Sequence, residues 1–176
     1  MKKFQVIGIG NAMVDVLARV DDAFLVENGV EKGIMTLIDT ARAAELYSHM
    51  GPAREVSGGS AANTIAGLAA LGARTAYIGK VKDDQLGAIF AHDMRAQGAG
   101  YDTPLAPKTH AAETGRCMVM VSPDSERSMN TYLGVSEFLA PDDIDAAQMA
   151  EAEWLYLEGY RFDGPDSQAA FAKAID

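Results

Sequence analysis

The chain has 176 residues, of which 48% are hydrophobic, and 25 acidic against 15 basic residues give a net charge of -10. This composition supports the core of one domain and argues against a disordered chain. The negative charge excludes a nucleic-acid-binding surface, although one small pocket can still be locally positive. The single cysteine, Cys117, excludes an internal disulfide, and the three scattered histidines give no metal-ligand spacing.

The first third of the chain alternates apolar runs with short helical patterns. Phe4–Gly10 is a β-branched apolar run that predicts a buried strand, and Val14–Val20 continues as an extended segment. Asp21–Asn28 predicts a short helix, Ile34–Ile38 a strand, and Ala41–Met50 a further helix. The start of the chain lacks a signal-peptide pattern, and no run approaches a membrane span, so we expect a cytoplasmic protein without membrane contacts.

The next elements indicate a parallel sheet. Ser60–Leu71 predicts a helix that ends at Gly72, Ala73–Gly79 a strand, and Asp84–Gln97 another helix. Alternating strands and helices require crossover connections, which are typical of a doubly wound α/β fold.

The pattern then changes to a hairpin. Thr114–Val121 and Arg127–Leu133 read as strands on either side of a turn-forming segment. After them we expect a helix opened by Pro141, a core strand at Trp154–Leu157, and a last helix from Pro165. That helix still runs at Asp176 with no closing strand, which predicts a missing C-terminal half; a fraying terminal helix is the alternative.

Two glycine motifs fail as nucleotide-binding loops. Gly8-Ile9-Gly10 follows a strand, but Met13 occupies the position where a dinucleotide fingerprint needs glycine or alanine. This substitution excludes a dehydrogenase-like nucleotide domain. Gly79-Lys80 is followed by valine instead of serine or threonine, so it is not a phosphate-binding P-loop.

Gly58-Gly59 precedes an alanine-rich helix that carries Asn63 in its first turn. Glycines let a ligand approach the backbone, and free amides at a helix start donate to ligand oxygens. Asn11 and Asp15 follow the first strand, at the sheet edge where α/β proteins bind ligands. On these residues alone, a capped connector and turn chemistry with a solvated acid remain the alternatives.

Three segments in order carry a resemblance to the PfkB carbohydrate kinase family. Gly58 to Gly72 (GGSAANTIAGLAALG) resembles the family's N-terminal signature, and Gly8 to Asp15 (GIGNAMVD) its first strand with sugar-binding Asn and Asp. Gly79 to Gly87 (GKVKDDQLG) resembles the segment in which Asp and Gly open the next helix. The three segments follow one another in the order expected for the family.

The resemblance implies a ribokinase-like α/β fold: a doubly wound, mainly parallel sheet with a small β-sheet lid. Residues 1–176 would be the N-terminal part of one such domain, with lid segments at about 14–20, 33–38 and 113–134. It also implies a small-molecule sugar or nucleoside as partner, ATP and Mg²⁺ as cofactors with K⁺ as a further candidate, and a homodimer through the lid. The implied substrate-binding residues are Asn11, Asp15, Met35, Leu37, Gly58, Gly59, Asn63, Cys117, Leu133 and Tyr160.

Within the family, three stretches look more like adenosine kinases than ribokinase: Gly10-Asn11, Thr114 to Cys117, and Leu155 to Phe162. In adenosine kinases an aromatic residue after this strand stacks on the base, which makes Tyr160 or Phe162 a candidate. Ordinary core packing is the alternative for Tyr160, and Arg161 stands where an apolar residue is expected.

The family's second signature, Asp-Thr-x-Gly-Ala-Gly-Asp, does not occur in this sequence. In the family it supplies the anion hole and the general base, so we expect no catalytic residue and no metal site in this chain, and an inactive fragment on its own. The expected function is an ATP-dependent kinase acting on a hydroxymethyl group of a nucleoside such as adenosine, or of a sugar. A non-catalytic sugar- or nucleoside-binding protein is the alternative.

Overall fold

The computed structural model describes residues 2–162 and 164–176, which form two sheets. The strands are β1 (Phe4–Ile9), β2 (Met13–Arg19), β3 (Met35–Leu37), β4 (Arg54–Gly58), β5 (Thr75–Ile78), β6 (Gly115–Val121), β7 (Arg127–Tyr132) and β8 (Ala152–Leu157). The helices are α1 (Asp22–Glu27), α2 (Thr40–His49), α3 (Ser60–Ala70), α4 (Gln85–Ala96), α5 (Ala146–Ala150) and α6 (Pro165–Ile175), with 3-10 turns η1 (Gly134–Phe138), η2 (Pro141–Asp143) and η3 (Gly159–Arg161).

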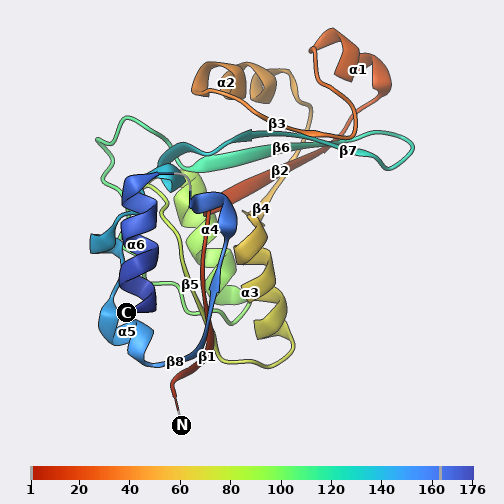
Figure 1. Ribbon diagram of the computed structural model, residues 1–176. Helices are drawn as coiled ribbons and strands as arrows, with labels where there is room; N and C mark the ends of the chain where they lie inside the picture. Colours follow the sequence, from red (N-terminus) through yellow and green to blue (C-terminus); the bar gives the residue numbers. More distant parts are fainter. Residues whose placement is uncertain (1, 163) are drawn as a thin grey trace.

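The parallel sheet has the order β5-β1-β8 and lies between two layers of helices (Figure 1). Alternate side chains of its strands enter two separate cores. On one face, Tyr77 and Ile65 pack in a cluster with Phe90 of α4. On the other, Ile7 packs with Phe171 of α6. This three-layer arrangement is the one predicted for alternating strands and helices.

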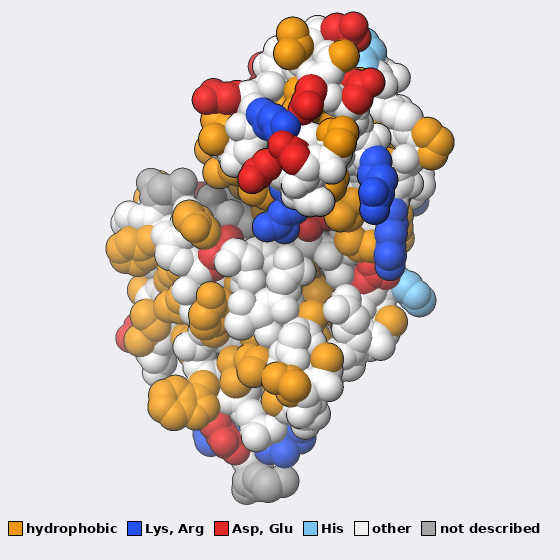
Figure 2. Space-filling view, turned by 90° about the vertical axis from the view of Figure 1, so that its right-hand side faces the viewer, with side chains coloured by type: hydrophobic (Ala, Val, Ile, Leu, Met, Phe, Trp, Pro, Cys, Tyr) orange, Lys and Arg blue, Asp and Glu red, His pale blue; other side chains and the backbone are white. Residues whose placement is uncertain are grey.

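The mixed sheet has the order β3-β7-β6-β2-β4 and lies beyond the carboxyl ends of the parallel strands (Figure 1). Its outer face packs against α1 and α2 through Leu25, Leu46, Met118 and Met120. Side chains one position away in these strands point to the opposite side, called the inner face below. In Figure 2 this sheet and its helices form an upper lobe on a larger lower lobe, with Lys and Arg side chains where the lobes meet.

The antiparallel pairing of β6 and β7 confirms the predicted hairpin, although β7 ends at Tyr132, one residue early. Gly134 has a φ of +55° and opens η1, so Leu133 lies outside the strand. Strand β4 was not predicted. Its residues (REVSG) show no apolar alternation because β4 is an edge strand with little burial.

Two further expectations about the last quarter of the chain were wrong. The segment opened by Pro141 forms only the short turn η2, and α5 starts later, after its N-cap Asp145. The strand predicted at Trp154–Leu157 exists as β8, but it is an edge strand of the parallel sheet, and Trp154 is 72% exposed.

No helix among the described residues is long and apolar enough to cross a membrane.

Candidate functional site

Asp15 lies on the inner face of the mixed sheet, near the start of β2, the strand that follows β1 of the parallel sheet. It pairs with Val56 of β4 on one side and with Cys117 of β6 on the other. Burial raises the pKa of its carboxyl to about 6, and the Arg127 guanidinium opposes this shift by lowering the pKa. A carboxylate that has lost much of its water gains strongly from a ligand's hydroxyl donors.

Gly58 and Gly59 leave room for the polar groups around them. A Cβ on Gly58 would overlap the Asp15 carboxylate, and a Cβ on Gly59 would overlap the Asn11 carbonyl oxygen. Gly59 also has a φ of +103°, a conformation that side chains rarely adopt. The two glycines therefore let the end of β4 and the start of α3 pack directly on the residues that follow β1.

Asn11 is a buried polar residue with an unused acceptor. Its side chain is 4% exposed, and among the described residues its Oδ1 atom has no hydrogen-bond partner. Leaving such an atom buried without a partner costs about 1–3 kcal/mol. Because Asn11 adjoins Gly59 at the strand ends, a ligand hydroxyl or amine there would satisfy this atom.

Glu158 holds this corner of the molecule together. Its carboxylate accepts hydrogen bonds from the backbone amides of Ala61 (2.7 Å) and Asn11 (3.4 Å), and the residue is 4% exposed. A Cβ on Gly10 would lie 2.5 Å from Glu158 Oε2, so glycine is needed for this approach. One carboxylate thus joins the end of β8 to the loop after β1 and to the first turn of α3, where anions are favoured.

The inner face presents two rows of side chains in register across the mixed sheet. The first row runs Asp15, Cys117, Thr131, Leu37, and the second runs Leu17, Val119, Met129, Met35. Apart from Asp15 and Thr131 these side chains are apolar or weakly polar. Met35 and Leu37 at the β3 edge are 51% and 59% exposed, so the apolar surface continues to the outside.

Cys117 and Thr131 form a buried pair in the first row. Thr131 Oγ1 donates to Cys117 Sγ at 3.3 Å, and both residues are 5% exposed. Burial raises the pKa of the Cys117 thiol to about 11, which keeps it a neutral thiol at neutral pH. Cys117 therefore contributes a small apolar surface beside Asp15.

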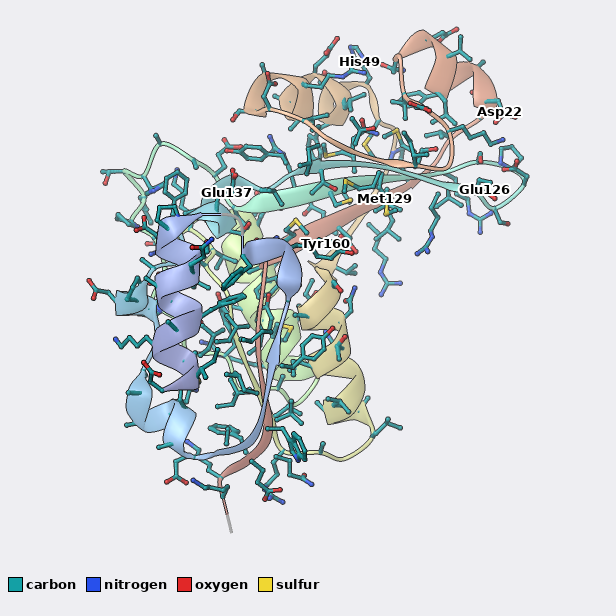
Figure 3. The ribbon with its side chains drawn as sticks, viewed as in Figure 1. Asp22, His49, Glu126, Met129, Glu137 and Tyr160 are labelled. Carbon is teal, nitrogen blue, oxygen red and sulfur yellow. The ribbon has the colours of Figure 1, made fainter. Side chains whose placement is uncertain are left out.

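Three other predicted site residues lie at the margin of this region. Asn63 is exposed in the first turn of α3, and its backbone N–H donates to the Gly59 carbonyl oxygen. Leu133 is half-buried at the foot of the β6–β7 hairpin. Tyr160 in η3 is 76% exposed, and Figure 3 shows it at the top of the lower lobe, below Met129 of the mixed sheet. Phe162 is exposed too, whereas the Arg161 side chain lies outside the described part of the chain.

Comparisons with known proteins identify the family and the fold. The model of the pfkB family of carbohydrate kinases matches residues 33–176. The chain belongs to this family. The predicted resemblance and the ribokinase-like α/β fold are thereby confirmed, and the fold is shared with solved adenosine and sugar kinases.

Two solved structures and one curated relative illustrate the similarity. An adenosine kinase from Sinorhizobium meliloti is 52% identical with a TM-score of 0.88, over 98% of this chain and 52% of that one. A probable sugar kinase from Rhizobium etli CFN 42 is 50% identical with a TM-score of 0.88, over 99% and 52%. An ATP-dependent ribose-1-phosphate kinase from Halopiger xanaduensis is 32% identical over 70% of this chain and 40% of its own. The chain thus spans about half the length of such pfkB-family proteins.

Sequence reasoning had overlooked Glu158, Thr131 and three members of the second row, Leu17, Val119 and Met129. A lone Glu after a strand carries no motif, and its partners are backbone amides far away in the sequence. The row of Leu17, Val119, Met129 and Met35 depends on the register of four strands, of which the sequence shows only the separate runs.

The described residues contain no group of three or more His, Cys, Asp or Glu side chains placed to hold a metal ion. Of the acidic groups at the site, Glu158 already accepts from backbone amides, and Asp15 lies in the first row beside the thiol of Cys117, with no second acid among the described residues of that row. The described residues therefore do not fit a Mg²⁺ site.

The raised pKa of Asp15 predicts that this residue lowers the free energy of unfolding of the ligand-free protein by an amount that depends on pH. Above pH 6 the folded state holds an ionised, half-buried carboxylate, so Asp15→Asn is expected to raise the unfolding free energy by about 1–2 kcal/mol at pH 7.5. Below pH 6 the folded wild type takes up a proton while the unfolded chain stays ionised down to pH 3.8, so the advantage shrinks toward pH 4. Denaturant unfolding at pH 7.5 and 4.5 measures this difference, and an equal gain at both pH values would contradict it.

Proposed function

We propose that this chain forms the acceptor-binding part of an ATP-dependent kinase that phosphorylates a hydroxymethyl group of a nucleoside or a sugar. Membership of the pfkB family supports the reaction class. The observation that carries the proposal is the close packing of two polar residues on Gly58-Gly59. The half-buried Asp15 carboxylate lies against Gly58, and the Asn11 backbone carbonyl lies against Gly59, while the buried Asn11 Oδ1 has no hydrogen-bond partner among the described residues. Such a pair suits vicinal hydroxyls of a small molecule.

In this proposal each residue has a simple task. Asp15 accepts hydrogen bonds from two neighbouring hydroxyls, and Asn11 Oδ1 accepts a further one. Gly58 and Gly59 carry no Cβ, which leaves room for the Asp15 carboxylate and the Asn11 backbone carbonyl at this position. Asn63, at the margin, offers an amide to the outer part of the ligand.

The inner face of the mixed sheet is proposed to act as a lid over the acceptor. Its apolar rows cover the less polar part of the ligand and exclude water, so that phosphate passes to the acceptor instead of to water. Met35, Leu37, Cys117 and Leu133 belong to this lid, and Tyr160 faces it from the lower lobe. The segments at 14–20, 33–38 and 113–134 form the lid together with β4, and pairing of two lids in a homodimer stays a prediction.

The transfer step is proposed to need residues beyond the part of the family represented here. We assign no general base among the described residues. We also propose that ATP binds to a part of the full-length protein outside these residues, because the chain spans about half the length of its relatives. Adenosine is one acceptor to test, since a solved relative at 52% identity is an adenosine kinase.

A panel of acceptors tests the proposal on the full-length protein. Adenosine, ribose and fructose are each incubated with ATP and Mg²⁺, and phosphomonoester formation is followed by ³¹P NMR, with calorimetry of each acceptor in parallel. We expect one acceptor class to yield a phosphomonoester, and the Asp15→Ala protein to lose this activity. Tight binding without any transfer would instead identify the non-catalytic binding protein. If the protein neither binds nor phosphorylates any of the acceptors, both functions are refuted.

A further inference from the structure

Asp84 occupies a junction between the two lobes and is absent from the acceptor site. It is the N-cap of α4, and its Oδ1 accepts from the amide of Gly87 at 2.8 Å. The same carboxylate reaches across to the residue before β6. Its Oδ1 accepts from Thr114 Oγ1 at 2.7 Å, and its Oδ2 accepts from the Thr114 amide at 3.0 Å.

Thr114 completes this junction from the other side. It is fully buried, and its Oγ1 accepts a hydrogen bond from the Lys82 amide at 3.0 Å. A Cβ on Gly87 would overlap the Lys82 carbonyl oxygen and lie 3.2 Å from Thr114 Oγ1. The Asp and Gly of the segment GKVKDDQLG therefore serve one arrangement: Asp84 binds Thr114, and Gly87 leaves room for it.

The two open ends of the β6–β7 hairpin, residues 113–115 before and at the start of β6 and residues 133–135 after β7, pack against each other next to this junction. A Cβ on Gly115 would lie 2.5 Å from the Leu133 carbonyl oxygen, and one on Gly134 would overlap the Glu113 carbonyl oxygen. The Val135 amide donates to Glu113 O at 2.8 Å. A shift of one end of the hairpin therefore shifts the other, because the two backbone segments are in direct contact with no free space between them.

The hairpin carries the middle of both rows on the inner face. Cys117 and Val119 come from β6, and Thr131 and Met129 come from β7. Cys117 also pairs directly with Asp15. The position of Thr114, where the hairpin starts, therefore sets the distance between the inner-face side chains of the hairpin and the lower-lobe residues Asn11 and Gly59.

We propose that Asp84 is a positioning residue for the acceptor site, which fixes the hairpin of the mixed sheet on the N-terminus of α4. The proposal rests on the proposed function for its catalytic consequence. Asp84 touches neither acceptor nor reacting atoms; it acts through Thr114 and the hairpin. A misplacement of the lid by a fraction of an ångström then weakens acceptor binding and lets water reach the site.

The test compares Asp84→Asn with Asp83→Asn in the full-length protein. Asparagine keeps the shape, but its amide nitrogen cannot accept from the Thr114 amide. Asp83 is the neighbouring acid, its side chain is 55% exposed, and its ion pair with Lys108 spans 3.9 Å, so it controls for loss of one charge. Thr114→Val removes the hydroxyl that binds Asp84, and Thr114→Ser restores it.

For Asp84→Asn and Thr114→Val we expect amide hydrogen exchange in residues 114–132 to quicken and the acceptor KM to rise roughly tenfold. ATP hydrolysis without transfer is expected to increase, while the KM for ATP stays within twofold. Asp83→Asn and Thr114→Ser should behave like the wild type. A merely structural role would lower the melting temperature without this split between the two substrates, and that result would overturn the proposal.

Hydrogen exchange in the absence of substrate separates this proposal from the proposed function. Unchanged exchange in the hairpin of Asp84→Asn and Thr114→Val would refute the positioning role, even if the protein is an active kinase. Faster exchange confined to the hairpin, in a protein that phosphorylates no acceptor, would support the positioning role while refuting the kinase function. If Asp84→Asn does not fold, the Thr114→Val and Thr114→Ser pair decides the matter.

Discussion

Replacing Asp15 with alanine in the full-length protein is expected to raise the KM for the acceptor about 100-fold, because two hydrogen bonds to a charged group are worth roughly 3 kcal/mol or more together. The carboxylate is desolvated in the ligand-free state, as its pKa of about 6 indicates, so its hydrogen bonds to a ligand replace little water. The KM for ATP is expected to stay unchanged. Steady-state kinetics with each substrate varied in turn measures both values.

The control for this substitution is Glu27→Gln on α1. Glu27 is an exposed acid in the helix that covers the outer face, so it tests the loss of one negative charge without touching the inner face. An Asp15→Ala protein with the acceptor KM and kcat of the wild type would remove Asp15 from the site. Because burial of Asp15 costs stability, the loss of binding is expected in a protein that remains folded.

Gly58→Ala is expected to lower kcat/KM for the acceptor about 100-fold, through displacement of a group that the substitution does not remove. A methyl group at Gly58 overlaps the Asp15 carboxylate, which must then turn away from the ligand. Gly67→Ala is the matched control, because a Cβ there meets no atom within 4 Å and lies in the same region, on α3. Circular dichroism and thermal unfolding check that both variants fold.

A double substitution tests the cause of this effect. If Gly58→Ala acts by displacing the carboxylate, it has little further effect in the Asp15→Ala background, since there is no carboxylate left to displace. Two fully additive losses would show that Gly58 acts independently of Asp15. In that case the close approach of the ligand to the Gly58 backbone becomes the better explanation of the glycine.

The order of local elements was readable from the sequence because each depends on nearby residues. The apolar run of β1, the bounds of helix α4 and the hairpin of β6 and β7 were all predicted within a residue or two. The motif of Gly58 to Gly72 also indicated the family, which the comparison with family models confirms. These features rest on periodicity, capping and turn chemistry, which act over a few residues.

Elements whose position depends on distant partners were predicted poorly. β4 shows no apolar alternation in its sequence. What holds it as a strand is its pairing with β2 and the Asp93 carboxylate, which accepts from the Ser57 backbone amide at 2.9 Å. β8 has an apolar sequence yet lies at the edge of its sheet. Burial is a property of the assembled layers, so a short run of sequence does not determine it.

The candidate site divides along the same line. The sequence by itself determined which residues near Gly58-Gly59, Asn11 and Asp15 bear the chemistry for binding hydroxyls, because amide, carboxylate and bare backbone are properties of residue type. Only the tertiary structure decided that Gly58 makes room for the Asp15 carboxylate, that Glu158 bonds to both Asn11 and the start of α3, and that Asp84 bonds to Thr114 at the start of the hairpin. These relations join residues that are 30 to 147 positions apart, and the packing of two lobes is what brings them into contact.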